Sequence, residues 1–273
     1  MVTYNLLVDP AVLLTFIWIT CACCSIIVYL HPLELGCIAR HGKLVSVERK
    51  ELDDSLTSNI VNIVNSSSFK VPKSLFWHFY LIGIMITLSI MVVISELRIT
   101  LILFLVHCGR RLYECVYITC YSESQMHLFG YCCGVMHYIL TPLTLAGVRN
   151  DSVSSVSFVC AVLLFAIGNI EQYRVHATLY REKLLKLKRR RLPRGYWFNF
   201  VCCPHYTAEI LIYFCFVLLN TSDIALLAMV LWVSSNLAVV SDFQYKWYQT
   251  YAVENSVASK AGWKIRRILP FCW

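Results

Sequence analysis

The sequence predicts an all-α integral membrane protein with about seven transmembrane helices, and six is the alternative count. Hydrophobic residues make up 58% of the 273 residues and charged residues only 15%, with a mean hydropathy of +0.63. A soluble domain is nearer half apolar and a quarter charged. The apolar residues also gather into segments close to the roughly 20 residues that a helix needs to cross hydrocarbon. We therefore expect residues 1–273 to form a single multi-span membrane domain.

The predicted spans follow one another along the whole chain. The third is the weakest, because Glu96 and Arg98 stand just before it and His107 just after it. If this segment did not cross the membrane, the count would fall to six. In chain order the predicted spans are 10–29, 75–95, 99–106 with its flanks, 128–146, 153–168, 208–220 with its upstream flank, and 224–240.

The distribution of Lys and Arg predicts the orientation. Loops on the cytosolic side of a membrane carry the excess of positive charge. With seven spans and a luminal N-terminus, 22 of the 24 Lys and Arg residues fall on the cytosolic side, and only Arg98 and Arg149 fall opposite. On this count, Arg110 and Arg111 belong to the loop after the third span. A wrong number of spans would scramble this asymmetry, so it favours seven spans and a cytosolic C-terminus.

A basic run precedes the sixth span. Residues 183–194 read KLLKLKRRRLPR, and such a run favours anionic lipid headgroups, each charge near the surface contributing about 1 kcal/mol. The alternative is a site for the phosphates of a dinucleotide, because the Arg guanidinium binds phosphate through two parallel hydrogen bonds. No G-x-G-x-x-G pattern follows a predicted strand, so a nucleotide would have to bind between membrane helices and their cytosolic loops.

Polar residues stand at the start of the sixth span. A helix that begins at Pro204, a residue favoured in the first turn, places His205 and Glu209 at i, i+4 on one face. Such a pair is equally compatible with a structural hydrogen bond. Together with three residues at the end of the fifth span, it forms a polar layer suited to hydrogen bonding a nucleotide. These three residues are Gln172, Tyr173 and His176.

Two further clusters lie at the predicted cytosolic ends of spans. Residues 76–80 read FWHFY, and aromatic rings at this depth are typical of the interfacial belt of membrane proteins, whereas His78 is a candidate proton donor. After the third span, Glu114 follows Arg110 and Arg111. This second segment is either a membrane anchor or the wall of a cationic pocket.

The 14 cysteines predict structural thiols. No C-x-x-C pair stands with a second such pair or with a pair of His residues. The pattern therefore favours free thiols over a disulfide framework and predicts no metal site. A buried free Cys behaves as a small hydrophobic side chain. The cysteines inside apolar runs include Cys21, Cys23, Cys24, Cys132, Cys133 and Cys215.

Short motifs along the chain carry a family resemblance. They are VPK at 71–73, HFY at 78–80, RRLYEC at 110–115, MH at 126–127, the residues Gln172, Tyr173 and His176, the segment 192–213, WY at 247–248 and LPF at 269–271. Together, over about residues 71–273, they resemble the steroid 5α-reductase superfamily, and more closely its polyprenal (polyprenol) reductase branch. Two departures stand out. Tyr245 occupies a position where the family usually offers His, and the tail after Tyr248 is longer than usual.

The resemblance implies a seven-helix fold in the endoplasmic reticulum membrane, with NADPH held on the cytosolic side and a reductase region at about residues 150–273. It places His78 near the substrate, which would be a long-chain polyprenyl lipid. Membrane lipid is the other expected partner, and we expect neither nucleic acid nor an obligate protein partner. By matching positions, the expected cofactor contacts are Gln172, His176, Lys183, Arg191, His205, Glu209, Tyr245 and Tyr248.

The implied reaction saturates the α-isoprene double bond of polyprenal or polyprenol, toward dolichal or dolichol for protein N-glycosylation. Hydride addition to an allylic alcohol leaves the developing charge nowhere to go, whereas the oxygen of an aldehyde carries it as an enolate that hydrogen-bond donors stabilise. The expected direct substrate is therefore polyprenal, with His78 or Tyr113 as the proton donor.

Three other functions remain open. An isoprenylcysteine-type carboxyl methyltransferase is also a small multi-span protein, but it uses S-adenosylmethionine and typically has Arg-His-Pro where this chain has Cys203, Pro204 and His205. A steroid or enoyl reductase of the same superfamily would share the NADPH cofactor. A lipid-binding or scaffolding membrane protein would tolerate substitution of His205 and Glu209.

The predicted topology is tested by a glycosylation acceptor inserted near residue 260. Because the C-terminal region is expected in the cytosol, this acceptor should stay unmodified, as judged by a gel shift after endoglycosidase treatment. The same acceptor fused to the predicted luminal N-terminus should be modified. Modification near residue 260 would contradict the topology.

Overall fold

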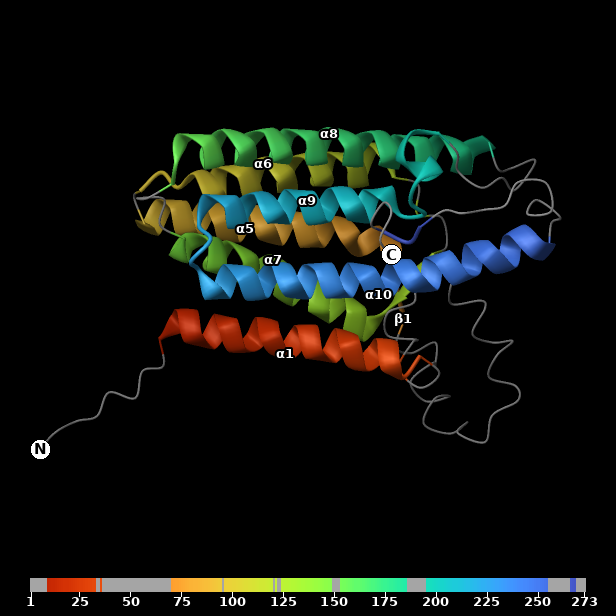
Figure 1. The fold of residues 1–273 in the computed structure, drawn as a ribbon, viewed down its shortest axis with the longest axis horizontal. Coiled ribbons are helices and arrows are strands. Elements are labelled where there is room, and N and C mark those ends of the chain that lie inside the picture. The colour runs from red at the N-terminus through yellow and green to blue at the C-terminus, as the bar shows by residue number, and fades with distance from the viewer. Residues whose placement is uncertain are drawn as a thin grey trace, which may run out of the picture.

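Seven α-helices are found among the residues that the computed structural model describes. These residues are 9–32, 35, 70–94, 96–119, 121, 124–148, 153–185, 195–254 and 266–268. The helices lie side by side, and α1, α6, α8 and α10 end where α5, α7 and α9 begin (Figure 1). The helices are α1 (Pro10–Leu30), α5 (Phe76–Ile94), α6 (Ile99–Tyr113), α7 (Leu128–Gly147), α8 (Ser155–Leu185), α9 (Pro204–Leu219) and α10 (Ile224–Glu254).

The predicted all-α membrane fold is confirmed. Five of these helices, α1, α5, α7, α8 and α10, are long and apolar enough to cross a membrane. The predicted third and sixth spans are the two shorter helices, α6 with 15 residues and α9 with 16. At 1.5 Å per residue they are roughly 22–24 Å long, and both lie within the bundle (Figure 1).

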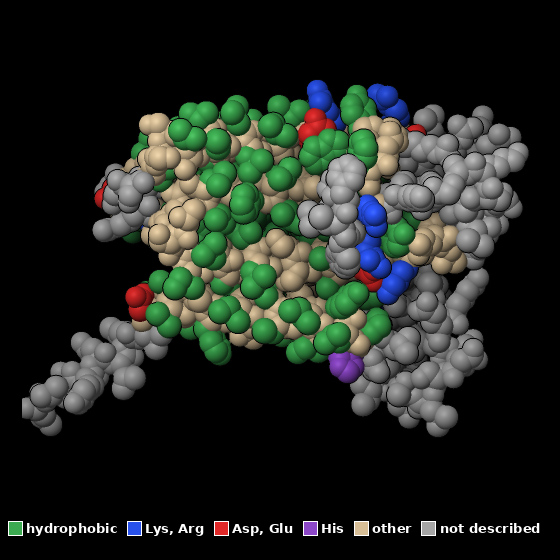
Figure 2. Space-filling model, viewed as in Figure 1, with side chains coloured by type: hydrophobic (Ala, Val, Ile, Leu, Met, Phe, Trp, Pro, Cys, Tyr) green, Lys and Arg blue, Asp and Glu red, His purple; other side chains and the backbone are tan. Residues whose placement is uncertain are grey.

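The outer surface of the bundle is apolar. Figure 2 shows hydrophobic side chains over most of the visible face, whereas Lys and Arg side chains gather toward one end. Val92 and Val93 on α5 and Phe16 on α1 are among the most exposed large hydrophobic residues. In water such a surface would be a large exposed apolar patch, but in a bilayer it is the expected lipid-facing surface.

Local sequence explains where several helices begin. The carboxylate of Asp9 accepts a hydrogen bond from the backbone N–H of Ala11 at 2.9 Å, which caps α1, and Pro10 fits the first turn. Pro204 has the same place in α9. At the start of α7, the ring of His127 accepts from the N–H of Phe129 at 3.1 Å.

Three helices continue beyond the spans that hydropathy predicts. The α6 helix extends to Tyr113, so Arg110 and Arg111 lie on it and not in the loop after it. The α8 helix extends from the predicted end at 168 to Leu185, and α10 extends from 240 to Glu254. Hydropathy marks only the part of a helix that is apolar, whereas a helix continues wherever its polar side chains find partners or water.

Short elements close the end of the bundle where α8 and α10 finish. Strands β1 (Lys70–Pro72) and β2 (Gln125–His127) pair antiparallel, and they hold the starts of α5 and α7 together. No strand was expected here from the sequence. A single β-bridge joins Val201 to Arg266. The remaining elements are the short helices η2 (Lys73–Leu75), η3 (Glu114–Ile118, a π-helix) and η4 (Tyr196–Asn199).

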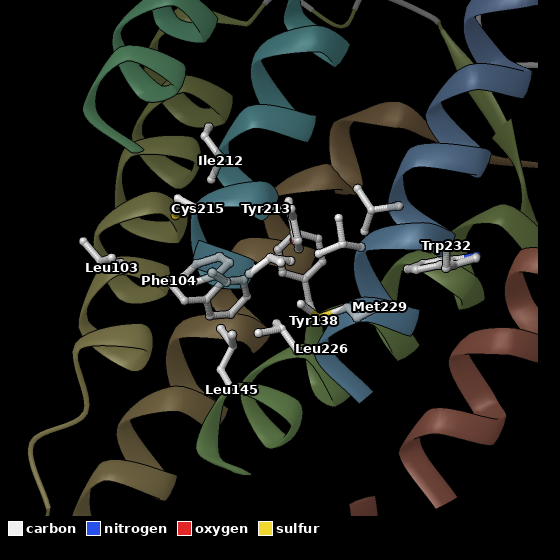
Figure 3. Packing of buried hydrophobic residues seen from close by; sticks show 14 of the residues in the cluster. Leu103, Phe104, Tyr138, Leu145, Ile212, Tyr213, Cys215, Leu226, Met229 and Trp232 are labelled. Atoms are coloured by element: carbon white, nitrogen blue, oxygen red, sulfur yellow. The ribbon is translucent and has the colours of Figure 1, made fainter. Parts of the chain in front are cut away.

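The buried core lies between α6, α7, α9 and α10. Figure 3 shows the aromatic side chains Phe104, Tyr138 and Tyr213 packed with Leu226 and Met229. Close helix packing also depends on small residues. A Cβ atom added to Gly168 of α8 would lie 2.7 Å from Cγ1 of Ile212 and 3.1 Å from the carbonyl oxygen of Ala208 on α9.

Gly168→Ala is therefore expected to push α8 away from α9 and to destabilise the protein by roughly 1–3 kcal/mol, as overpacking does. The matched control is Gly109→Ala on α6, where an added Cβ meets nothing within 4 Å. That change should be neutral or stabilising, because Ala favours a helix over Gly by up to about 1 kcal/mol. Thermal unfolding in detergent measures both, and equal stability of the two variants would contradict the packing argument.

Candidate active site

One cavity of about 850 Å³ opens between the helices. This volume is typical of a site for a small molecule or a cofactor. Side chains of α1, α7 and α10 give its wall a mostly apolar character. The polar members of its wall include Lys73, Arg111, Gln172, His176, His205 and Glu209, and large aromatic members are Phe79, Tyr80, Tyr138, Tyr213 and Trp232.

Three helices bring polar side chains together at the polar end of the cavity. On each helix the residues are spaced three or four apart, which places them on one face. We call this set the polar cluster. Its members are His107, Arg110, Arg111 and Glu114 from the α6 side, Asn169, Gln172 and His176 from α8, and His205 and Glu209 from α9.

Glu114 is the buried centre of the polar cluster. Its side chain is fully buried and forms ion pairs with both Arg110 and Arg111. In addition, Nδ1 of His176 lies 2.7 Å from its Oε2 atom. The sequence had left open whether Glu114 and the two arginines are a membrane anchor or a pocket wall. Because Arg111 lines the cavity, the pocket-wall interpretation is confirmed.

Hydrogen bonds extend from Arg110 to Glu209. Nε of Arg110 donates to Oδ1 of Asn169 at 2.8 Å, and its Nη2 donates to the side-chain oxygen of Gln172. The amide of Gln172 donates in turn to the carboxylate of Glu209. On the other side, Oε1 of Glu209 lies 3.5 Å from Nε2 of His107. One continuous network therefore links α6, α8 and α9.

The network keeps Glu114 ionised. Burial alone would raise the pKa of its carboxyl group, but the hydrogen bond from His176 and the charges of Arg111 and Arg110 outweigh burial and lower the pKa to about 2. Removal of the carboxylate would leave two largely buried guanidinium groups, with side chains only 18% and 12% exposed, without their counter-ion. Such a loss is more costly than the pair itself is stabilising.

Tyr80 on α5 contacts the network from the cavity side. Its oxygen accepts hydrogen bonds from Nη2 of Arg111 at 2.8 Å and from Nε at 3.1 Å, and the guanidinium lies 5.0 Å from its ring centre. With two N–H groups bound to the oxygen, the Tyr80 O–H is left to donate to a group in the cavity that both residues line.

His205 presents a buried polar atom without a partner. Its Nδ1 has no hydrogen-bond partner among the described residues, although the ring lies 5.6 Å from that of His176 and lines the cavity. A buried unsatisfied nitrogen costs about 1–3 kcal/mol, and in a native structure it calls for an explanation such as a ligand.

The structure brings four of the predicted cofactor residues together. Gln172, His176, His205 and Glu209 all line the cavity, and the prediction that His205 and Glu209 share one face is confirmed. Tyr173, the remaining member of the predicted polar layer, has a side chain that is 40% exposed and does not line the cavity, so its contact with a nucleotide stays a prediction. Tyr173 follows Asn169 by four residues and precedes His176 by three, so it lies at the edge of their face, and its side chain reaches the outer surface.

Of the other predicted cofactor residues, Tyr245 and Tyr248 are not part of the cavity wall. On α10, Tyr245 lies under the guanidinium of Arg267 at 5.2 Å, and Tyr248 packs with Cys202 and Cys203 in a separate cluster. Their predicted contact with a cofactor stays a prediction. Lys183 lies on α8, but its side chain and the whole of Arg191 fall outside the described residues.

The two predicted proton donors also lie outside the cavity wall. Nδ1 of His78 is 2.8 Å from the hydroxyl of Tyr131. Tyr113 is 52% exposed and packs on Tyr117 with ring centres 5.1 Å apart. The structure therefore brings neither residue to the polar cluster, and their catalytic role stays a prediction.

Sequence reasoning missed several residues of the site. His107 was noted only as an interruption of the third span, and Tyr80 only as part of an aromatic belt. Asn169 and the buried His137 were not singled out. Spacing was the available signal: the positions 107, 110, 111 and 114 follow one face of a helix, as do 169, 172 and 176.

Glu114→Gln is expected to destabilise the protein by about 3 kcal/mol or more, because two buried cations lose their counter-ion. Since folding lowers the pKa of Glu114 from 4.5 to about 2, its contribution is fully present above pH 4.5 and is lost as the pH falls toward 2. The variant should lose this acid-dependent part of its stability, measured by thermal unfolding between pH 3 and 7.

The matched control is Glu171→Gln on α8. Glu171 forms an ion pair at 2.8 Å with Arg174, whose side chain is 55% exposed, so its loss should cost at most about 1 kcal/mol. If Glu114→Gln were no more destabilising than Glu171→Gln, the central role of Glu114 would be wrong.

Comparison with known proteins identifies the family. The family model described as 3-oxo-5-alpha-steroid 4-dehydrogenase matches residues 117–255. The polyprenal reductase of Saccharomyces cerevisiae is 32% identical over 205 residues, which cover 74% of this chain and 75% of that protein. The polyprenal reductase of Caenorhabditis elegans is 26% identical over 278 residues, with 83% and 86% covered. That of Xenopus tropicalis is 27% identical over 300 residues, with 88% and 96% covered. The chain therefore belongs to the 3-oxo-5-alpha-steroid 4-dehydrogenase family, within the steroid 5α-reductase superfamily, and to its polyprenal reductase branch.

Proposed function

We propose that this protein uses NADPH to reduce the α-isoprene double bond of polyprenal, toward dolichal and dolichol. The observation that carries the proposal is a single cavity that joins the polar cluster to an apolar, aromatic wall. One end suits a charged and hydrogen-bonding cofactor, and the other suits an isoprenoid. The relatives at 26–32% identity, all polyprenal reductases, support the same substrate.

The residues present fit a nicotinamide cofactor. The unpartnered Nδ1 of His205, the amide of Gln172 and the carboxylate of Glu209 offer a donor and acceptors of the kind that a carboxamide requires. Arg111 and Lys73 supply positive charge to the same wall, which suits phosphate groups. When bound, the cofactor would supply a hydride, and the protein would supply binding and orientation.

Tyr80 is proposed to hold the aldehyde oxygen of the substrate. Arg111 fixes its oxygen through two hydrogen bonds, so its O–H is oriented before substrate binds. A fixed donor aimed at an oxygen that gains negative charge stabilises the transition state more than the ground state. This role requires an aldehyde and therefore supports polyprenal over polyprenol as the direct substrate.

The polyprenyl tail is proposed to extend into lipid. A long isoprenoid chain exceeds a cavity of about 850 Å³. Along α1 and α7 the cavity wall includes Cys24, Phe129 and Cys132, which are also exposed on the outer surface. The reacting head would thus reach the polar cluster while the tail remains in the bilayer.

The proposed location is the endoplasmic reticulum membrane, with the N-terminus in the lumen and the C-terminus in the cytosol. The polar cluster lies toward the end of the bundle where α1, α6, α8 and α10 finish (Figure 1). The Lys and Arg distribution assigns this end to the cytosol, where NADPH is available. Dolichol made there would serve protein N-glycosylation.

The test is incubation of membranes containing the protein with NADPH and polyprenal, followed by mass analysis of the lipids. We expect a gain of two hydrogens with polyprenal and none with polyprenol. No gain with either lipid would contradict the proposal. A steroid reductase would instead reduce a 3-oxo steroid supplied in place of the lipid.

Cofactor binding distinguishes the proposed reductase from the remaining alternative, a carboxyl methyltransferase. NADPH should raise the thermal stability of the purified protein, and S-adenosylmethionine should not. Glu209→Gln should weaken NADPH binding about tenfold or more, because it replaces a charged acceptor in the network. Protection by S-adenosylmethionine alone would favour a methyltransferase.

A further inference from the structure

A buried imidazole lies in the apolar part of the cavity wall. His137 on α7 is 8% exposed and is surrounded by the rings of Trp18, Tyr138 and Trp232, whose centres are 4.9–5.8 Å from its own. Burying an ionisable group among aromatic side chains at membrane depth costs folding free energy. Such groups usually mark a functional site. The polar cluster described above does not include His137.

His137 is held by two hydroxyl groups. Its Nε2 lies 2.6 Å from the hydroxyl of Tyr213, and its Nδ1 lies 3.2 Å from Oγ1 of Thr141. The ring is therefore bound through both nitrogens. Because Nδ1–H can donate to Thr141, Nε2 is free to accept a proton from Tyr213 or to return one.

Tyr213 places this pair next to the proposed cofactor site. It follows Glu209 by four residues on α9, so both share one face, and both line the cavity. One helical turn, about 6 Å along the axis, separates them. Figure 3 shows Tyr213 and Tyr138 among the packed side chains of the buried core. The hydroxyl thus stands between the cofactor-binding residues and the apolar wall.

We propose that Tyr213 delivers the proton to the α-carbon of the substrate and that His137 relays it from behind. This inference rests on the proposed function and assigns its second half-reaction. Tyr213 is the residue that contacts the substrate, and His137 is a positioning residue that acts through Tyr213.

Protonation of the α-carbon completes the reduction. After the β-carbon has received a hydride, the substrate is an enolate whose negative charge lies mainly on oxygen. Its electron pair re-forms the C=O bond while the α-carbon forms a new C–H bond with the proton of Tyr213. The O–H bond of Tyr213 breaks and is re-formed with the Nε2 proton of a protonated His137. A proton from bulk solvent, which is the proton that the overall reduction consumes, later restores the protonated His137.

The surrounding groups favour this assignment over other donors. The oxygen of Tyr80 is held by Arg111, which suits a donor to the aldehyde oxygen but not a proton relay. From α6, the ring of His107 lies 6.5 Å from that of Tyr213, and its Nε2 lies 3.5 Å from the Glu209 carboxylate. That carboxylate supplies a nearby negative charge that offsets a proton on His137. Besides Tyr213, the phenol of Tyr138 also faces His137.

The test uses the reverse of the proposed step and needs no NADPH. Membranes containing the protein are incubated with dolichal in D₂O, and deuterium at the α-carbon is followed by mass analysis. We expect the protein to exchange one α-hydrogen, and Tyr213→Phe to lower the exchange rate at least about 100-fold, which is the usual contribution of a positioned acid or base. The matched control is Tyr29→Phe, at an exposed position on α1, which should keep the wild-type rate.

Two substitutions of His137 separate a relay from a structural anchor. His137→Leu removes both ring nitrogens. His137→Gln keeps an N–H donor for Tyr213 but cannot take up and release a proton. A relay predicts exchange at least tenfold below wild type in both variants. Wild-type exchange in His137→Gln would overturn the relay, and wild-type exchange in Tyr213→Phe would overturn the whole inference.

Separate control experiments test the folding of each variant and the proposed function. Each variant must show a wild-type thermal shift with NADPH, which excludes loss of exchange through misfolding. Reduction of polyprenal by the wild-type protein tests the proposed function in its own right. Reduction without dolichal exchange in the wild type would overturn the inference and leave the proposed function intact.

Discussion

The buried carboxylate of Glu114 is the constraint on which the rest of the site depends. A fully buried charge is tolerated only when it is paired and hydrogen bonded, and this one is met by Arg110, Arg111 and His176. These partners come from α6 and α8, so the two helices must keep their depth and rotation for the charges to stay compensated. The hydrogen bonds that Arg110 sends on through Gln172 to Glu209 extend the same requirement to α9.

This requirement determines what the cavity can bind. Arg111 is held by Glu114, and it therefore fixes Tyr80 while it still faces the cavity. The polar groups that remain unsatisfied, above all Nδ1 of His205, are those that a ligand would engage. A network of this kind is rigid before the ligand arrives, and fixed dipoles that need no reorganisation are the main source of electrostatic catalysis.

The apolar part of the cavity also holds its side chains in a defined arrangement. Aromatic rings from α5, α7, α9 and α10 line it, and within it the imidazole of His137 lies in hydrogen-bond contact with the hydroxyl of Tyr213. Reduction of a conjugated double bond needs a donor for the oxygen and a donor for the α-carbon. The structure offers one phenol at each border of the polar cluster, Tyr80 from α5 and Tyr213 from α9, each held by a different cation-forming partner.

The sequence by itself determined the membrane class, the seven helices, the family and four of the cavity residues, because hydropathy, charge asymmetry and the spacing of His205 and Glu209 are local properties. In the sequences of α6 and α8, polar residues also recur every three or four positions, which predicts one polar face on each helix. Only the tertiary structure decided which of these faces meet. It showed that α6 continues through Arg110 and Arg111, that Tyr173 faces outward, and that His137 meets Tyr213 from another helix. The reason is physical: a buried charge or imidazole selects its partners by distance and by the loss of water, and neither quantity exists until the helices have packed.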